Sequence, residues 1–175
     1  MFKNKKLKFR VIKKKDLDLL INLRNETSTW EMLKNIELID YSKQINWFDK
    51  LKNDPSRKYF VIENLKNLFL GVIRMDEIDY INRTIRIGCD IIKKERGKGY
   101  GSQTFDLILD YCFNYLNMNK AWLEVVTYNK TAIKLYKRKG FVKEGLIRKN
   151  IYRNGKYYNS ILMGILKSEY KKTLK

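Results

Sequence analysis

The sequence contains no histidine, and this absence removes several kinds of active site. Without an imidazole the chain can form neither a Ser-His-Asp triad nor an HExxH zinc site. Histidine is also the commonest general base at neutral pH. Any acid–base chemistry must therefore come from Glu, Asp, Tyr, Lys or water.

Cysteines and long apolar runs are also scarce. The cysteines are Cys89 and Cys112, each within an apolar stretch, so we expect two buried, reduced thiols, no disulfide framework and no metal site. No segment approaches the roughly 18 consecutive apolar residues of a membrane-spanning helix, and the N-terminus lacks the apolar core of a signal peptide. These absences favour a cytoplasmic protein without a membrane partner.

The composition is that of one folded domain with a strong basic bias. Hydrophobic residues make up 44% of the 175 residues, the single proline marks no linker, and no repeat divides the chain, so we expect one domain over residues 1–175. Lys and Arg number 38 against 19 Asp and Glu, which gives a formal charge of +19. An AT-rich coding sequence alone would enrich lysine. Because the lysines are scattered rather than striped, we favour anionic small molecules as partners over a dedicated nucleic-acid surface.

Hydrophobic periodicity predicts an α+β fold with a mixed sheet. Asp16 and Ser42 are candidate N-caps of two helices in the N-terminal half, Gly140 stands at a helix stop, and Asn154-Gly155 predicts a hairpin turn. The predicted strands are 7–12, 58–64, 68–76, 84–92, 121–127, 141–147 and 160–166, and the later helices are 101–116 and 130–139. The three strands from 58 to 92 are typical of an antiparallel meander, and the helix–strand order after them predicts a crossover.

A glycine-rich segment, residues 96–102 (RGKGYGS), joins the strand 84–92 to the longest helix. Glycines at this spacing let successive backbone N–H groups turn toward one anion, and the following helix N-terminus adds its dipole. The segment is neither a Walker A loop, since no GK[ST] ends it, nor a convincing dinucleotide fingerprint. A pyrophosphate would fit it, although a plain strand-to-helix turn would also contain glycines.

Two motifs in the C-terminal half resemble the GNAT superfamily of N-acetyltransferases. Arg96, Gly99 and Gly101 match its loop Gln/Arg-x-x-Gly-x-Gly/Ala, and residues 129–141 (NKTAIKLYKRKGF) match its second signature, N-x-x-A-x-x-L-Y-x-x-x-G-F. The resemblance covers residues 84–147. It implies a V-shaped, mostly antiparallel mixed sheet flanked by helices, in which strands 84–92 and 121–127 splay apart. It also implies acetyl-CoA as the co-substrate of an N-acetyltransferase.

The resemblance further implies which residues hold acetyl-CoA. Backbone of the strand end would pair with the pantetheine arm, main-chain amides of the glycine-rich segment would hold the pyrophosphate, and Lys98 would add charge. Lys134 and Lys137 are candidates for the distal phosphate, although lysines on a helix surface are often only solvated. The implied cofactor residues are Cys89, Asp90, Ile91, Arg96, Gly97, Lys98, Gly99, Tyr100, Gly101, Ser102, Asn129, Lys134 and Lys137.

Two residues match the family's catalytic positions. The implied mechanism is direct attack of an amine on the thioester, with Tyr136 as general acid to the CoA thiolate and Glu124 as base, often through water. Tyr136 could instead be a packing residue of an amphipathic helix. Glu124 is harder to explain by packing, because a carboxylate in the apolar strand AWLEVVT is costly to bury unless it is paired or protonated.

The acceptor is expected to be recognised by the N-terminal half. Arg24-Asn25 and Asn46-Trp47-Phe48 are similar to the branch that acetylates 4-amino-dideoxy sugars linked to a nucleotide. Asn46 stands where such enzymes often carry His, so the base must be another group, Glu124 or Glu77. Aromatic side chains could stack on a base or sugar, although aromatics at helical spacing are also typical of a core. The expected acceptor residues are Arg24, Asn25, Trp47, Phe48, Glu77 and Tyr80, with Trp30, Met32 and Tyr128 also considered.

Other acceptors and other functions stay open at this point. Ribosomal-protein-type N-terminal (alanine) acetyltransferases share the same motifs. Polyamine acetylation is less attractive, because a charge of +19 repels polycations unless a local acidic pocket such as Asp76, Glu77 and Asp79 overcomes the field. A module that binds acetyl-CoA without turnover is disfavoured by the intact Glu124, Asn129 and Tyr136. Family members commonly pair through their C-terminal strands, which implies a possible homodimer.

Overall fold

A computed structural model describes residues 2–170 and contains one seven-stranded sheet in the order β1-β2-β3-β4-β5-β7-β6. The strands are β1 Leu7–Val11, β2 Lys58–Asn64, β3 Phe69–Asp79, β4 Thr84–Ile91, β5 Lys120–Val126, β6 Val142–Arg153 and β7 Lys156–Leu166. The helices are α1 Leu17–Asn25, α2 Thr27–Trp30, α3 Tyr41–Lys52, α4 Tyr100–Asp110 and α5 Lys130–Arg138. Short helical turns are η1 Lys14–Asp16 and η2 Lys93–Glu95, and the π-helix η3 Tyr111–Tyr115 extends α4.

Strands β1 to β4 form an antiparallel meander, which confirms the arrangement expected for residues 58–92. Side chains along these strands alternate between two cores. Ile62 and Ile73 face the main core with α4, whereas Val61 and Val72 face a second core with Leu20 and its neighbours on α1. Helices α1 and α3 therefore cover one face of the sheet, and α4 covers the other.

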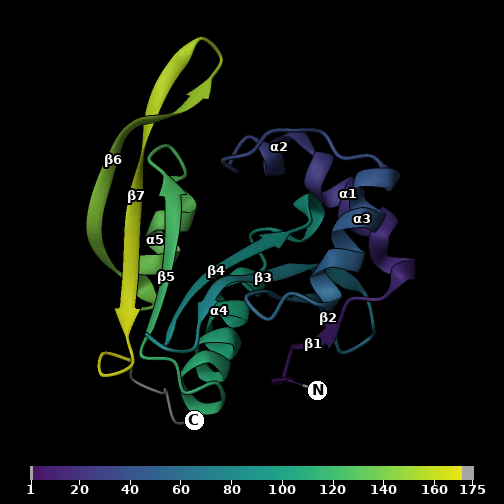
Figure 1. Cartoon of the computed structure of the whole chain (residues 1–175), viewed down its shortest axis with the longest axis horizontal. Helices are drawn as coiled ribbons and strands as arrows, with labels where there is room; N and C mark the ends of the chain where they lie inside the picture. The colour runs from purple at the N-terminus through teal and green to yellow at the C-terminus, as the bar shows by residue number, and fades with distance from the viewer. Residues whose placement is uncertain (1, 171–175) are drawn as a thin grey trace.

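The sheet opens into a V between β4 and β5, as the family resemblance implies. These strands run parallel and pair at Thr84↔Lys120, Ile85↔Ala121 and Arg86↔Trp122, and within the described chain the pairing goes no further. Beyond Arg86 the two strands separate (Figure 1). The V leaves one edge of β4 and one edge of β5 facing a gap.

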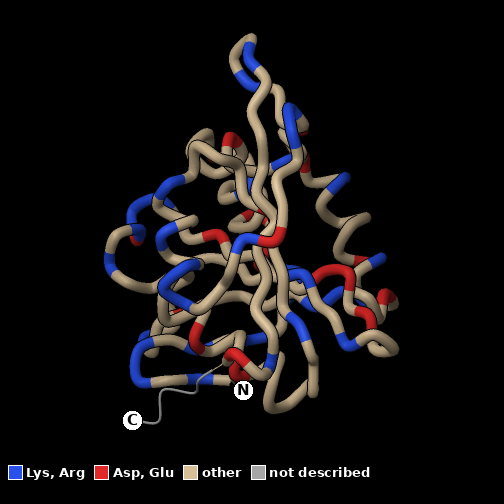
Figure 2. The backbone as a smooth tube through the Cα atoms, turned by 90° about the vertical axis from the view of Figure 1, so that its left-hand side faces the viewer, with Lys and Arg blue, Asp and Glu red and all other residues tan. Residues whose placement is uncertain are grey.

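The C-terminal strands form a long hairpin around the predicted Asn154-Gly155 turn, where φ is 49° and 75°. Both strands are longer than the periodicity predicts, because exposed polar residues interrupt the apolar alternation of β6. Figure 2 shows the hairpin projecting beyond the rest of the trace, and it shows Lys and Arg spread over many elements. Arg153 near its tip donates hydrogen bonds to the carbonyls of Leu33 and Lys34, so the hairpin is tied to the segment after α2.

Both predicted N-caps of the N-terminal half need correction. Asp16 stands at the N-cap position of α1, but its carboxylate accepts from Arg10 Nη1 and Nη2 at 2.7 and 2.8 Å and from Lys13 N at 2.7 Å rather than from the helix. Helix α3 is capped by Asp40, whose Oδ1 accepts from Lys43 N at 2.8 Å, and Ser42 lies inside the first turn. In residues 2–170, no helix is long and apolar enough to cross a membrane.

Candidate active site

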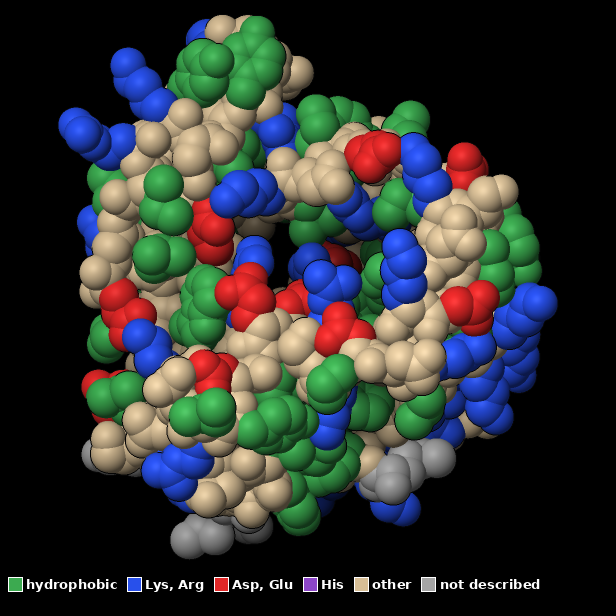
Figure 3. Space-filling model, in the orientation of Figure 1, with side chains coloured by type: hydrophobic (Ala, Val, Ile, Leu, Met, Phe, Trp, Pro, Cys, Tyr) green, Lys and Arg blue, Asp and Glu red, His purple; other side chains and the backbone are tan. Residues whose placement is uncertain are grey.

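A cavity of about 670 Å³ occupies the V between β4 and β5. In the space-filling view it is a hollow with basic and acidic side chains around it (Figure 3). Its walls come from β4, the glycine-rich segment, β5 and α5, and from residues 32–35 after α2. Tyr128 Oη donates to Glu31 O at 2.6 Å and Arg153 holds Leu33, so two ties from the C-terminal half keep the segment after α2 over the cavity.

The glycine-rich segment presents free backbone donors to this cavity. Gly97 and Gly99 have φ of 79° and 84°, which glycine adopts without strain, and Gly99 is the N-cap of α4. Among residues 2–170, no acceptor takes the backbone N–H groups of residues 97–102, since Gln103 N is the first to bond back, to Gly99 O at 3.2 Å. Such a row of amides at a helix N-terminus fits a pyrophosphate. The cavity therefore suits acetyl-CoA.

Arg96 does not take part in that row, which corrects part of the expected cofactor set. Its backbone N–H is bonded to Lys93 O at 3.2 Å, and its guanidinium turns to Ile91 O at 2.8 Å, Ser28 Oγ at 2.6 Å and Thr29 Oγ1 at 2.7 Å. The side chain thus joins the glycine-rich segment to α2. The Arg96 guanidinium therefore has a structural role here.

Three lysines of the expected cofactor set are exposed and lie outside the cavity lining. Lys98 forms an ion pair with Glu95, at 3.1 Å, and Lys134 and Lys137 lie on the outer surface of α5. The other members of the set, Cys89 to Ile91 and Asn129, do line the cavity, where the free edge of β4 and the side chain of Asn129 are available. Asn129 also caps α5, with Oδ1 accepting from Ala132 N at 3.1 Å.

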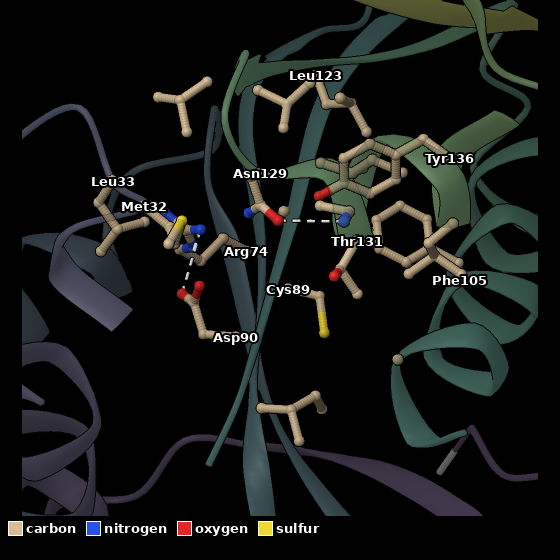
Figure 4. A pocket seen from close by; sticks show the side chains of 18 of the residues that line it. Met32, Leu33, Arg74, Cys89, Asp90, Phe105, Leu123, Asn129, Thr131 and Tyr136 are labelled. Atoms are coloured by element: carbon tan, nitrogen blue, oxygen red, sulfur yellow. Dashed lines mark hydrogen bonds and ion pairs between the residues drawn. The ribbon is translucent and has the colours of Figure 1, made fainter. Parts of the chain in front are cut away.

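Tyr136 lies on α5 with its ring against Phe105 and Phe141, at centroid distances of 5.1 and 5.9 Å. Figure 4 shows its hydroxyl pointing into the cavity, toward Asn129, with Cys89 nearby. Burial, followed by the charges of Cys89 and Asp90, raises the pKa of this phenol well above its ordinary value. The hydroxyl therefore stays protonated at neutral pH, as a general acid must.

Cys89 also faces the cavity, but it is a poor nucleophile. Burial is the main cause that raises the pKa of its thiol far above the ordinary value. Because the thiolate is the reactive form, this thiol is inert at neutral pH. The site thus favours direct transfer over a route through an acetylated cysteine.

Glu124 on β5 is held by groups from three other parts of the chain. Its Oε1 accepts from Ser160 Oγ at 2.5 Å and from Asn150 Nδ2 at 2.9 Å, and Lys34 Nζ lies 3.9 Å from Oε2. Burial acts to raise the pKa of Glu124, but these hydrogen bonds and the charges of Lys34 and Arg86 outweigh it, so the pKa falls below its ordinary value. Glu124 is therefore an anion at neutral pH, able to attract a cationic amine and to accept its proton through water.

The expected acceptor residues do not all reach the cavity. Arg24 lines it, whereas Asn25 is bound to the backbone of Ile39 by bonds of 2.7 and 2.9 Å and holds the loop after α2. Trp47 and Phe48 pack in the second core, where the Trp47 ring lies 5.2 Å from that of Tyr59. The helical spacing of these two aromatic residues therefore reflects packing in the core and not binding of the acceptor.

Glu77 and Tyr80 also lie outside the cavity. Glu77 pairs with Arg86 at 2.9 Å on the surface, and Tyr80 is half exposed beside Lys58. Of the other aromatics considered, Tyr128 is a tie to Glu31 and Trp30 does not line the cavity, whereas Met32 does.

The sequence reasoning missed an ion pair in the cavity wall. Arg74 on β3 and Asp90 on β4 lie 3.1 Å apart and are visible in Figure 4 across from Tyr136. It also missed Ser160 and Asn150, the partners of Glu124. Their places depend on pairing between strands that are distant along the chain, and no local motif marks them.

The comparisons with known proteins agree with this geometry. The family model described as an acetyltransferase (GNAT) domain matches residues 6–142. Spermidine N(1)-acetyltransferase of Vibrio cholerae serotype O1 is 30% identical over 174 residues, covering 95% of this chain and 96% of the relative.

Solved structures give the same result. The crystal structure of spermidine N-acetyltransferase from Vibrio cholerae in complex with CoA and spermine has a TM-score of 0.92 at 29% identity, covering 95% of this chain and 99% of the other. A dodecameric structure of that enzyme has a TM-score of 0.83 at 30% identity, covering 94% and 96%. These proteins are described as acting on spermidine, so the resemblance to the nucleotide-sugar branch is not confirmed.

Proposed function

The chain belongs to the acetyltransferase (GNAT) family and is an acetyl-CoA-dependent N-acetyltransferase, and on that premise we propose that it acetylates a primary amine of a small molecule in the V-shaped cavity. Tyr136 is proposed as the general acid and Glu124 as the anion that receives the amine proton. One observation carries this proposal: Tyr136, Glu124 and the residues of the glycine-rich segment with free amides, except Lys98, line the same cavity although they come from three parts of the chain.

The proposed reaction balances with these two groups. The neutral amine attacks the acetyl carbon, so an N–C bond forms and the C–S bond breaks. One proton of the ammonium form passes through water to Glu124 before the attack. The Tyr136 hydroxyl donates a proton to the departing thiolate, and the second proton lost by the attacking nitrogen returns Tyr136 to its neutral form. A phenol of raised pKa and a carboxylate of lowered pKa are in the required starting states at neutral pH.

Spermidine is one candidate acceptor, and the support for it comes from the relatives. Carboxylates in the cavity lining offer binding partners for ammonium groups, namely Asp76, Asp90, Glu95 and Glu124. Each of these already has a cationic partner, since Asp76 pairs with Arg57, Asp90 with Arg74, Glu95 with Lys98 and Glu124 with Lys34. A polyamine would have to compete with those pairs.

An amine that also carries an anionic group is the second candidate, and the cavity charge favours it. Basic side chains in the lining outnumber the acidic ones, and they are Arg24, Lys34, Arg74, Arg86, Arg96 and Arg138. Since the whole chain carries a charge of +19, the field around the cavity attracts anions. The amino nucleotide sugar expected from the sequence belongs to this class.

An acceptor panel separates these candidates. Free CoA would be measured by a thiol reagent with spermidine, a UDP-linked 4-amino-4,6-dideoxyhexose, an Ala-initiated peptide and glucosamine 6-phosphate. Turnover with spermidine alone would assign polyamine acetylation, and turnover with the phosphate-bearing amines would assign the second class. Turnover with the peptide alone would move the acceptor to protein N-termini, and no turnover with any amine would contradict the proposed function.

We also propose that the chain assembles with copies of itself. The supporting observations are the dodecameric relative and the exposed apolar side chains of the hairpin, including Val142, Leu146, Tyr152 and Tyr157. Strand β6 is an edge strand, and an exposed apolar edge is a site for pairing. Light scattering after size exclusion would give the molar mass, and a 21.1 kDa monomer at all concentrations would contradict the proposal.

A further inference from the structure

Two arginines from neighbouring elements contribute to the wall of the cavity. Arg74 comes from β3 and Arg24 from the last turn of α1, and both line the cavity. Arg74 lies over Gly88, its register partner on β4, where a Cβ would come within 3.0 Å of Nη2 and 3.3 Å of Cζ. The missing side chain at Gly88 therefore lets the Arg74 guanidinium reach the cavity surface.

Each of the two arginines keeps a buried N–H group without an acceptor among residues 2–170. The unpaired atoms are Arg24 Nη1 and Arg74 Nε. The remaining contacts are few: Arg24 Nη2 donates to Asn35 O, and Arg74 Nη2 meets Asp90 Oδ2 at 3.1 Å. Buried guanidinium N–H groups are normally hydrogen-bonded, so the chain leaves two incompletely paired guanidinium groups on residues that line one cavity.

The charges in this wall are not balanced. Asp90 is the carboxylate that pairs with Arg74, and within residues 2–170 no carboxylate lies within 4 Å of the Arg24 guanidinium. By contrast, Lys34 lies 3.9 Å from Glu124 and Arg86 lies 2.9 Å from Glu77. Burial is the main cause that lowers the pKa of Arg24; the positive charge of Arg74 adds to it, and the charges of Asp90 and Glu37 act in the opposite direction. An anion between Arg24 and Arg74 would relieve their repulsion.

We infer that Arg24 and Arg74 form an anion-binding subsite, which holds a carboxylate or phosphate group of the acceptor while its amine is acetylated. The inference rests on the proposed function and narrows its acceptor to the second candidate class. Guanidinium groups bind carboxylate and phosphate oxygens through paired N–H donors, which gives orientation as well as affinity. Arg74 lies across the cavity from Tyr136 (Figure 4), so an acceptor held at this arginine can extend its amine toward the catalytic side.

Spermidine is disfavoured by the same geometry. Its ammonium groups would meet two guanidinium groups in a wall where one carboxylate is already paired. The subsite thus predicts a preference for an anionic amine, whereas the relatives are named for spermidine.

Matched acceptors test the inference directly. Glucosamine 6-phosphate and glucosamine share one amine and differ in the phosphate, and β-alanine and β-alaninamide differ in the carboxylate. The kcat/KM of the anionic member should exceed that of its neutral partner by about 10- to 1,000-fold. The two pairs also distinguish phosphate from carboxylate. Equal values in both pairs, or a higher kcat/KM for spermidine, would overturn the subsite while leaving the acetyltransferase function in place.

Arg24→Gln is the informative variant, because Arg24 has no carboxylate partner that its loss would leave unpaired. It should remove most of the preference for the anionic amine and leave the KM for acetyl-CoA within about twofold. Arg74→Lys keeps a charge beside Asp90 and should reduce the preference without unfolding the wall. Arg148→Gln, on the exposed surface of β6 outside this cavity, is the control and should keep the wild-type preference. An unchanged preference in Arg24→Gln would overturn the inference.

A binding readout keeps the inference testable if none of these amines is acetylated. In the presence of CoA, glucosamine 6-phosphate and β-alanine would be added during thermal unfolding of the wild type and of Arg24→Gln. At least one of them should raise the Tm of the wild type, and not that of the variant. No shift with either ligand, or the same shift in both proteins, would overturn the subsite independently of activity.

Discussion

Tyr136 and Glu124 are in opposite protonation states at neutral pH, and the cause is local. Tyr136 is surrounded by aromatic rings and Cys89, which keep its phenol neutral, whereas Glu124 receives hydrogen bonds from Ser160 and Asn150, which keep its carboxylate charged. The apolar side of the cavity thus supplies the acid, Tyr136, and the polar side supplies the proton acceptor, Glu124. No histidine is needed for this division of roles.

The first prediction concerns the Tyr136 hydroxyl. Tyr136→Phe keeps the ring packing against Phe105 and removes the proton donor, so kcat should fall by about 10- to 1,000-fold while the Kd for acetyl-CoA stays nearly constant. Steady-state kinetics and a binding titration measure the two quantities. Tyr152→Phe, on the exposed hairpin, serves as the control, and a wild-type kcat in Tyr136→Phe would assign the acid to another group.

The second prediction concerns the pH dependence of Glu124. Because the folded pKa of Glu124 lies below its ordinary 4.5, the carboxylate stays ionised as pH falls from 9 to about 5, and any loss through its protonation comes only below that range. Glu124→Gln should lower kcat by about 10- to 100-fold and move the pH optimum upward, since the amine must then lose its proton to bulk solvent.

The control for Glu124→Gln is Glu144→Gln on β6, whose carboxylate pairs with Lys120 at 2.7 Å outside the cavity. A pH–rate profile of Glu124→Gln that superimposes on the wild-type profile would remove Glu124 from the proton-accepting role.

At the residue scale, local motifs were sufficient for some site residues and insufficient for others. Tyr136, Asn129 and the amides of the glycine-rich segment are set by short-range spacing, so the sequence pointed to them. Arg74 and Ser160 reach the site through strand register, and Asn150 reaches it from the stretch of β6 where the register shifts, between Ile147 and Ile151. Trp47 and Phe48 were misjudged because core aromatics and stacking aromatics share the same helical spacing.

At the element scale, β3 packs closely against the part of β4 that borders the V. Gly71 on β3 is the register partner of Ile91, and a Cβ built on it would lie 2.0 Å from the carbonyl oxygen of Asp90. The glycine therefore lets β3 approach the part of β4 that forms the free edge of the V. No flexible side chain can yield to a substitution there.

The third prediction is a stability effect at this close approach. Gly71→Ala should lower the free energy of unfolding by about 2–4 kcal/mol, because a backbone atom must move to admit the methyl group. Urea unfolding measures it. Gly145→Ala on β6 is the matched control, since its Cβ would meet Leu162 Cδ1 at an ordinary 3.6 Å, and equal effects of the two substitutions would contradict the packing argument.

Most elements of the fold could be predicted from the sequence, and the exceptions have physical reasons. The meander and the helix after the glycine-rich segment follow from clear periodicity. Helix α2 was not predicted, because a segment of four residues is too short to show the hydrophobic periodicity of a helix. The full length of β6 was not predicted, because most of its residues are exposed and need not alternate between apolar and polar.

At the scale of the whole molecule, the charge of +19 has two competing explanations. The excess of lysine either attracts anionic ligands or reflects an AT-rich coding sequence. If the field attracts acetyl-CoA, screening should weaken that attraction, since the Debye length falls from about 10 Å at 0.1 M salt to about 3 Å at 1 M. The fourth prediction is that the KM for acetyl-CoA rises by about 3- to 10-fold between 0.05 and 0.5 M NaCl, with a smaller change in kcat. A KM independent of salt would leave the lysine excess as compositional bias.

The central claim is that this cavity transfers an acetyl group from acetyl-CoA directly to an amine. The most direct measurement is the simultaneous appearance of free CoA and acetylated amine, followed by mass spectrometry with and without the amines of the acceptor panel. The account predicts release of CoA only when an amine is present, one acetylated amine for each CoA, and no acetyl adduct on Cys89. Release of CoA without an amine, or an acetylated Cys89 that forms and decays during turnover, would contradict it.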